Sequence, residues 1–386
     1  MPLVDFEPTA VQRATRALAR EFAEAEIEPH ASSWDREHRF PAEVFDKLAG
    51  LGLMGVCVPE ELGGAGGDFV SYVLVLEELS RADAGVGVTV AVHTSAVTLP
   101  LAAFGSEEQR LTFVLPLARG ERLGAFALTE SGSGSDAAAL ATTATRTETG
   151  WRLSGTKQWI TNGSFANVFL VFARTDPVAG SRGISAFVLD DTDVEVTREE
   201  EKLGLNSSST ADLAIDADVS ADRLLGDEGK GFAIAMATLD GGRIGIAAQA
   251  VGIAQAAFDV ASAYARERHA FGHRIGDFQA IQHKLANMAV EIEAARLLTL
   301  RAAWLKDRGE RVTEAGAKAK LFASETARRQ TAEAIQILGG YGYTKAYPVE
   351  RYYRDAKVTE IYEGTSEIQR LVIARSILGE RRGAPV

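Results

Sequence analysis

Three glutamates near the C-terminus are the residues of this chain best suited to acid–base chemistry. Glu360, Glu363 and Glu367 stand close together before a segment with helical character. Ser366 and Gln369 fit a capping box, which predicts that the helix begins there but does not explain Glu363. A carboxylate in an apolar cleft is a suitable base for removing a proton from carbon. Glu363 is therefore our candidate base, with Glu360 and Glu367 as competing candidates.

Two stretches in the middle of the chain could hold a phosphate and a flat ring. The Gly/Ser-rich residues 128–136 follow the apolar run 123–127, and exposed backbone N–H groups of such a loop can bind a phosphate. A plain flexible loop is the alternative. Residues 159–161, Trp-Ile-Thr, offer an aromatic face and a hydroxyl donor. Asn162 and Gly163 would also fit an ordinary hairpin turn.

A basic cluster and a glycine-rich helix end complete the set of candidate sites. The cluster consists of Arg266, Arg268, His269, His273 and Arg274. It could contact a pyrophosphate, or it could be a solvated turn. Gly272 interrupts the helix that would align the two histidines, so we expect no metal. In residues 336–343 the glycines predict a helix C-terminus, and they could also allow close approach to a ligand.

The hydrophobic period divides the chain into three parts, with domains expected at 1–120, 121–226 and 227–386. The first part has helical spacing, which Pro29, Pro41, Pro59 and Pro100 are expected to break into short pieces. The second part contains short strands, namely the apolar runs 168–172 and 183–189 and the alternating residues 213–219. The third part has wide apolar stripes on long helices, as in a helix bundle or a subunit interface.

Composition limits the classes of partner and compartment. The 386 residues carry a net charge of −12, which argues against a nucleic acid as the main partner because such binding depends on neutralising phosphates. The single cysteine, Cys57, suits a reducing compartment. No leader pattern and no run of 18 apolar residues stand out, so we expect no membrane span and a cytoplasmic location.

Together these stretches resemble the acyl-CoA dehydrogenase family over nearly the whole chain. The resemblance rests on residues 59–64, 128–136, 159–163, 268–272, 336–340 and 362–367, in this order. Residues 239–247 look most like those of short-chain and short branched-chain members. The resemblance implies an α+β protein with an N-terminal helical domain, a middle antiparallel β-barrel and a C-terminal four-helix bundle, together with FAD and a homotetramer.

The resemblance also implies roles for individual residues. FAD would be bound by Phe126, Leu128, Thr129, Ser135, Trp159, Ile160, Thr161, Thr365 and Glu367 and, from a neighbouring subunit, by Arg268, Phe271, Gln279, Gln336, Ile337, Leu338, Gly339 and Gly340. The acyl-CoA would contact Ser135, Asp240, Arg243, Tyr362 and Gly364. Glu363 would be the catalytic base. Some members place the base on an earlier helix, at the position that Gly242 occupies here, and a glycine cannot serve.

The implied reaction is the removal of two hydrogens from an acyl-CoA to give the trans-2-enoyl-CoA. Glu363 takes the α proton, the β hydrogen passes to the flavin, and the electrons continue to an electron-transferring flavoprotein. Ala237 stands where straight short-chain members have a bulkier residue, which would deepen the acyl pocket and favour short- to medium-chain substrates. The alternatives are an acyl-CoA oxidase and a catalytically silent flavoprotein with a regulatory role.

Overall fold

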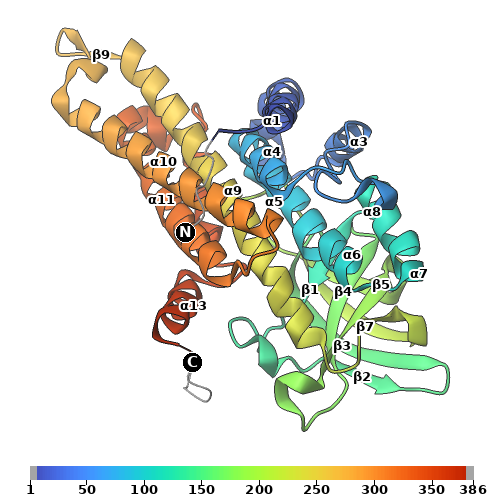
Figure 1. Ribbon diagram of the computed structural model, residues 1–386. Coiled ribbons are helices and arrows are strands. Elements are labelled where there is room, and N and C mark those ends of the chain that lie inside the picture. The colour runs from blue at the N-terminus through green and yellow to red at the C-terminus, as the bar shows by residue number, and fades with distance from the viewer. Residues whose placement is uncertain (1–6, 380–386) are drawn as a thin grey trace.

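In the computed structural model, which describes residues 7–379, short helices, a β-sheet and a set of long helices follow one another along the chain (Figure 1). The N-terminal helices are α1 (Ala10–Phe22), α2 (Glu28–Glu37), α3 (Ala42–Gly50), α4 (Phe69–Ala82), α5 (Ala84–Ala91), α6 (Leu99–Phe104), α7 (Glu107–Gln109) and α8 (Leu115–Ala118). The helical character predicted for this part of the chain is confirmed.

The expectation that prolines break these helices is wrong for Pro29 and Pro100. Both lie at the first or second position of a helix that continues directly from a π-helical segment, Ala23–Ile27 or Val92–Thr98. Proline lacks an N–H and crowds the carbonyl one turn earlier. A wider π turn before the proline changes that hydrogen-bond pattern, so the backbone stays helical.

The middle of the chain forms an eight-stranded sheet with the order β6-β7-β3-β2-β4-β5-β8, to which β1 is added beside β4. The strands are β1 (Gly124–Ala127), β2 (Thr143–Arg146), β3 (Gly150–Thr161), β4 (Val168–Arg174), β5 (Ile184–Asp190), β6 (Val194–Glu199), β7 (Thr210–Ser220) and β8 (Leu224–Leu225). The predicted strands at 168–172, 183–189 and 213–219 are confirmed as β4, β5 and β7.

The expected antiparallel β-barrel is open, and not all of its strand pairs are antiparallel. β1 and β4 pair in parallel, and the terminal strands β6 and β8 do not pair with each other. β8 has only two residues, and β6 exposes most of its side chains, among them Glu195 and Arg198. A short strand and a charged strand both resist further pairing, so the sheet remains open.

Long helices form the C-terminal part, where α9, α10 and α11 lie side by side (Figure 1). The shorter α12 packs against α9 and α11. The elements are α9 (Gly231–Glu267), the hairpin of β9 (His269–Ala270) and β10 (His273–Arg274), α10 (Gln279–Asp307), α11 (Thr313–Leu338), α12 (Val349–Val358) and α13 (Ser366–Leu378). On α10, Met288, Ile292 and Ala295 are buried as their spacing predicts, whereas Val290 is 69% exposed. A second apolar face of α10 is thus left uncovered within the chain.

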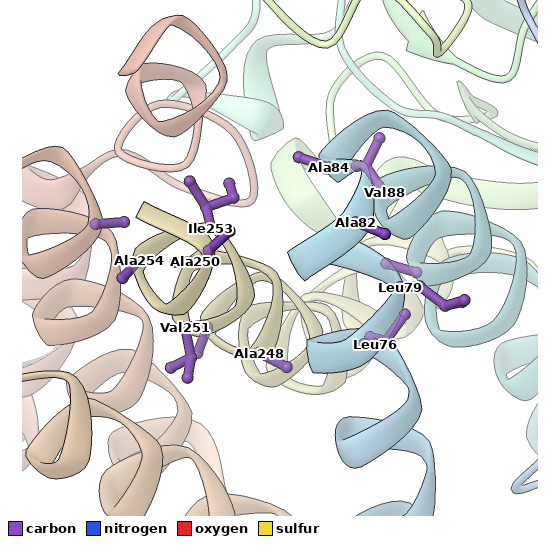
Figure 2. Close-up of a cluster of buried hydrophobic side chains, with 14 of the residues drawn as sticks. Leu76, Leu79, Ala82, Ala84, Val88, Ala248, Ala250, Val251, Ile253 and Ala254 are labelled. Atoms are coloured by element: carbon purple, nitrogen blue, oxygen red, sulfur yellow. The ribbon is translucent and has the colours of Figure 1, made fainter. Parts of the chain in front are cut away.

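The N-terminal helices and α9 share one hydrophobic core. Figure 2 shows Leu76 and Leu79 of α4 close to the stretch of α9 that contains Ala250 and Val251. The helices can approach this closely because residue 252 is a glycine. A Cβ at Gly252 would lie only 2.4 Å from the carbonyl oxygen of Glu77. Small residues on α9 therefore fix the N-terminal helices against the bundle.

Two helical stretches of the described chain are long and apolar enough to cross a membrane by length and composition alone. They are Ala84–Phe104 and Gly231–Glu267. In their most apolar windows, 83% and 78% of the residues are buried inside the protein. This burial is typical of core helices, which need no lipid to cover their apolar side chains.

Candidate active site

A cavity of about 190 Å³ lies where the sheet, α9 and the segment before α13 meet. We call it the glutamate cavity. Of the residues predicted to bind cofactor or substrate, it is lined by Phe126, Leu128, Thr129, Ser135, Trp159, Ile160, Thr161, Arg243, Tyr362 and Gly364, and by the candidate base Glu363. Val88, Val92, Met236, Leu239 and Ile246 add apolar walls. Segments distant in the sequence thus converge on one space.

A bulge in β3 directs Trp159 toward this cavity. The register of β3 against β7 shifts between Lys157 and Ile160, and both of these side chains are buried although regular alternation would put them on opposite faces. Trp159 has a φ of 60° and is 54% exposed. Bulges commonly re-aim a side chain next to an active site. Here the bulge presents an indole to the cavity.

The hairpin turn considered at Asn162 and Gly163 is not formed. β3 pairs with β2 and β7, not with the following strand β4. Asn162 is fully buried in a left-handed conformation, and its side-chain amide donates to the carbonyls of Thr89 and Gly124. Asparagine adopts this backbone conformation more readily than most residues. It fixes the end of β3 to the helical domain beside the cavity.

A buried ion pair beneath the Gly/Ser loop was not found from the sequence. Lys157 Nζ lies 2.8 Å from Glu130 Oε1 and also donates to the carbonyls of Leu128 and Phe172. Glu130 accepts two backbone N–H groups, those of Ala141 and Thr142. The pair therefore ties the start of the loop, and residues 141 and 142 beyond its end, to β3.

A signal for Lys157 exists in the sequence. It shares the alternation of Trp151 and Leu153, both of which are buried core residues of β3. A charge at an inward position of a strand requires a buried partner.

The candidate base lies in a tight turn between α12 and α13. Glu363 and Gly364 have φ values of 54° and 87°, both in the left-handed region. The predicted capping box at Ser366 is wrong, because Thr365 is the N-cap and its hydroxyl accepts the N–H of Ile368. The side chain of Gln369 instead donates to the carbonyls of Glu363 and Gly364. The cap residue is thus next to the turn, and Gln369 holds the turn itself.

Glu363 is electrostatically suited to accept a proton. Burial raises the pKa of its carboxyl group to about 7, against the opposing effect of the nearby cations Arg243 and Lys320. Its Oε2 atom is shielded from solvent and has no hydrogen-bond partner in the described part of the chain. A Cβ at Gly242 would lie 2.5 Å from that atom. The Gly242 position and the Glu363 carboxylate therefore compete for one space.

The two competing glutamates do not line the glutamate cavity. Glu360 binds Arg328 and Lys357 at 2.7 and 2.6 Å. Its burial would raise its pKa, but these hydrogen bonds outweigh that effect and leave the pKa below its usual value. Glu367 is exposed on the first turn of α13, outside the cavity, although the resemblance places it in the FAD site. Glu363 alone among the three reaches the cavity.

Of the α9 residues predicted to contact the substrate, Arg243 lines the glutamate cavity, but Asp240 and Ala237 do not. Arg243 lines the cavity and donates to Asp240 at 2.7 Å, while its Nε atom is buried without a partner among residues 7–379. Asp240 does not line the cavity and also accepts a hydrogen bond from Thr313. Ala237 is exposed, and Met236 and Leu239 contribute to the cavity wall instead. Helical rotation therefore removes the support for Ala237 as the residue that sets pocket depth.

A second hollow, of about 520 Å³, lies at the other end of α9. We call it the arginine hollow, and of the predicted residues it is lined by Arg268, Ile337, Leu338, Gly339 and Gly340. Phe271 is 93% exposed in the turn between β9 and β10, and Gln279 and Gln336 are exposed outside both cavities. Arg268 follows Arg243 by 25 residues of helix, which corresponds to about 38 Å. One chain therefore cannot bring Arg268 to its own glutamate cavity.

Comparison with known proteins identifies the family of this chain. Family models described as the N-terminal, middle and C-terminal domains of acyl-CoA dehydrogenase match residues 9–121, 125–217 and 229–378. The chain belongs to the acyl-CoA dehydrogenase family. Enzymes of this family are FAD-dependent oxidoreductases.

Individual relatives cover almost the whole acyl-CoA dehydrogenase chain. The mitochondrial short-chain specific acyl-CoA dehydrogenase of Bos taurus is 52% identical over 95% of this chain and 90% of its own. The structure of butyryl-CoA dehydrogenase from Megasphaera elsdenii superposes with a TM-score of 0.96 at 45% identity, over 97% and 100% of the two chains. A chain from a structural study of the electron transferring flavoprotein of Acidaminococcus fermentans gives 0.97 at 46% identity, over 98% and 100%.

The residues of the glutamate cavity fit the cofactor that the family uses. Trp159 offers an aromatic face, and Thr129 and Thr161 offer hydroxyl groups for the polar edge of a flavin. At Gly134 a Cβ would meet no atom within 4 Å, so the loop has room for a ligand. Arg243 Nε and Glu363 Oε2 are buried polar atoms without protein partners in the described chain. Such atoms in an enzyme cleft call for a bound ligand.

Proposed function

We propose that Glu363 is the base with which this acyl-CoA dehydrogenase removes the α proton of a short-chain acyl-CoA. One observation carries the proposal: the unpartnered Oε2 atom of Glu363 faces the space beside Gly242 in a cavity that also contains Trp159 and Thr161. A general base must lie within reach of the proton it accepts. A molecule bound between α9 and the sheet would lie beside this carboxylate.

The chain's own residues support the proton transfer in two ways. The Glu363 backbone N–H donates to no acceptor within residues 7–379, so it is available to a thioester carbonyl. A hydrogen bond there would stabilise the charge that develops on the carbonyl oxygen as the α proton leaves. Tyr362 and the apolar wall residues exclude water around the base. When FAD is bound, its flavin ring supplies the two-electron acceptor.

The raised pKa of Glu363 predicts how the reaction rate depends on pH. The carboxyl group accepts a proton only when it is ionised, and burial raises its pKa to about 7. Below that value the protonated form dominates and cannot act as a base. The rate of α-proton removal should therefore rise as the pH increases through neutrality, and a plot of rate against pH would show this limb.

The test of the proposed function is an anaerobic titration of the FAD-loaded protein with straight and singly branched acyl-CoA thioesters of increasing length. The names of the Bos taurus and Megasphaera elsdenii relatives support short substrates, with butyryl-CoA first. We expect loss of the oxidised flavin absorbance with short-chain thioesters. A flavin that responds only to long-chain thioesters would contradict the proposed chain length, and one that none of them reduces would contradict the proposed substrate class.

We also propose an electron-transferring flavoprotein as the redox partner and a homotetramer as the assembly. The similarity to the Acidaminococcus fermentans chain supports the first. Exposed apolar side chains on α10 and α13, among them Val290, Ile377 and Leu378, support the second. Reduction of the partner flavin in a stopped-flow mixture and the mass from light scattering test the two proposals.

We also propose a cytoplasmic location, because a chain with a single cysteine suits a reducing compartment. Burial raises the pKa of the Cys57 thiol to about 12, so this thiol is poorly suited to redox chemistry.

A further inference from the structure

Lys320 is a fully buried cation beside the proposed base that the reaction described above does not use. It lies on α11, on a face where Gly316, Ala323 and Ala327 provide little bulk. Its Nζ atom donates to the carbonyl oxygen of Gly364 at 2.7 Å. A buried lysine is costly unless it is compensated by hydrogen bonds or opposite charge. The position of Lys320 therefore requires a reason.

The carbonyl that Lys320 contacts belongs to the turn that carries the base. Glu363 and Gly364 are both left-handed, a conformation in which a non-glycine residue such as Glu363 is strained. Gln369 Nε2 lies 3.0 Å from the carbonyl oxygen of Glu363 and 2.7 Å from that of Gly364. Lys320 is the second buried side chain on the Gly364 carbonyl. Two side chains from α11 and α13 thus hold this turn.

We propose that Lys320 is a positioning residue for Glu363, which holds the Gly364 carbonyl so that the base stays aimed into the cavity and whose charge favours the ionised carboxylate. The proposal rests on Glu363 being the base. Lys320 itself does not line the glutamate cavity. Its effect is transmitted through the backbone of one residue and through the local electrostatic field.

The charged and titratable groups around Glu363 define what removal of Lys320 would change. They are Arg243 on α9, Lys320 on α11, Tyr72 on α4, and Tyr362, Glu360 and Glu367 in and around the turn. Glu360 is already paired with Arg328 and Lys357. Without Lys320, Arg243 would be the remaining cation that lowers the pKa of Glu363. The pKa of Glu363 should then rise. The part of the pH profile in which the rate increases, which we call the limb, should move to higher pH.

Lys320 also titrates close to neutrality. Burial lowers the pKa of its ammonium group to about 7, while Glu363 opposes that shift. The two groups are therefore coupled, and the observed limb belongs to the pair.

The experiment compares anaerobic flavin reduction by butyryl-CoA in single-turnover mixing, across a pH series through neutrality, for FAD-loaded parent, Lys320→Met and Lys320→Gln. We expect Lys320→Met to slow flavin reduction roughly 10- to 100-fold, because a misplaced base loses its alignment. The limb should shift upward by about one pH unit, because one nearby positive charge is lost. Lys320→Gln keeps a donor without the charge, so it should recover much of the rate at high pH but retain the shifted limb.

Two controls separate positioning from folding. Ser324→Ala removes another buried polar group one turn further along α11, where Ser324 Oγ donates to the Lys320 carbonyl, without touching the turn. Lys318→Met removes a partly exposed charge from the same helix. FAD content and thermal unfolding, measured for all variants, report structural damage. Neither control should move the pH limb.

The outcomes are distinguishable. An unchanged rate and an unchanged limb in both Lys320 variants would overturn the proposal. A loss of stability and rate without a shift of the limb in Lys320→Gln would reduce Lys320 to a structural residue and also overturn it. If no acyl-CoA reduces the flavin of the parent, the proposed function fails first, and the role of Lys320 fails with it.

Discussion

The glutamate cavity and the arginine hollow lie at opposite parts of the long helix α9 and differ in completeness. The glutamate cavity is enclosed by the helical domain, the sheet and the bundle, and a buried ion pair, Lys157 with Glu130, lies beneath its loop. In the arginine hollow, Arg268 contacts the ring of Tyr341 but pairs with no carboxylate of the described chain. Phe271 projects almost fully into solvent nearby.

The difference teaches that one chain encloses the residues proposed for catalysis but leaves the arginine hollow open. Desolvated groups such as Glu363 acquire a shifted pKa only where several elements exclude water. The arginine hollow lacks that enclosure. An anionic ligand held by a second subunit would supply both the missing charge and the missing cover.

The largest expected effect is in the glutamate cavity, where Glu363→Gln should abolish most turnover. Glutamine keeps the shape and hydrogen bonding of the turn but cannot accept the α proton, so flavin reduction should slow by ~10²–10⁴-fold. FAD content should stay at the parent level. Glu360→Gln, which alters a carboxylate outside the cavity, is the matched control. Single-turnover flavin reduction near the parent rate in Glu363→Gln would place the base elsewhere.

The second effect concerns the ion pair beneath the cavity loop. Lys157→Met should lower the free energy of unfolding by about 3–5 kcal/mol, because it leaves Glu130 as a buried charge without its cation. Arg152→Met, on the same strand, removes partly exposed pairs with Asp216 and Asp218 and should cost about 1 kcal/mol or less. Urea denaturation of both variants measures the difference. Equal costs would mean that burial of Lys157 is not what stabilises the loop.

Gly242→Ala should disturb the base from the opposite wall. The new methyl group would lie 2.5 Å from Glu363 Oε2, so the carboxylate must move and flavin reduction should fall on the order of 10²-fold. Gly241→Ala is the control, because its methyl group would meet the Lys306 ammonium at an ordinary 3.4 Å. Similar rates for the two variants would show that the Gly242 wall does not constrain the base.

The smallest effect is expected in the arginine hollow. Arg268→Ala should weaken FAD binding and subunit assembly together, by about 1.5–3 kcal/mol for one charge-assisted contact. Arg274→Ala, in the adjacent hairpin but paired with Asp277, should leave both unchanged. FAD titration and sedimentation measure the two quantities. Normal FAD affinity in an intact Arg268→Ala assembly would mean that the hollow serves neither purpose.

Local pattern predicted the elements more reliably than their closure. The alternation of Leu213, Ile215 and Val219 predicted a strand, and these side chains are buried in β7. The pattern is local because successive residues of a strand point to opposite faces of the sheet. Closure of the sheet depends instead on whether the distant edge strands β6 and β8 meet, so the local pattern could not predict that the barrel stays open. The breaks at Pro29 and Pro100 were also wrongly expected, because the preceding π turns are not visible in local composition.

The candidate site followed the same division. Glu363 and Trp159 were predicted as site residues from their residue types, and both line the glutamate cavity. Their roles as base and flavin contact stay predictions. Asp240, Gln279, Gln336 and Glu367 do not line either hollow in a single chain. The support of the turn by Lys320 could not be predicted, since a lysine on a helix is usually solvated.

The sequence by itself determined the family, the order of helical and strand-rich segments, and the chemical types available at each motif. These properties depend on side-chain identity and on short spacings, which the chain carries before it folds. Only the tertiary structure decided that Gly242 faces Glu363, that Lys320 reaches Gly364, and that Arg268 lies far from the base. Proximity between distant segments and exclusion of water arise when helices and sheet pack, and those two conditions set the distances and pKa values on which catalysis depends.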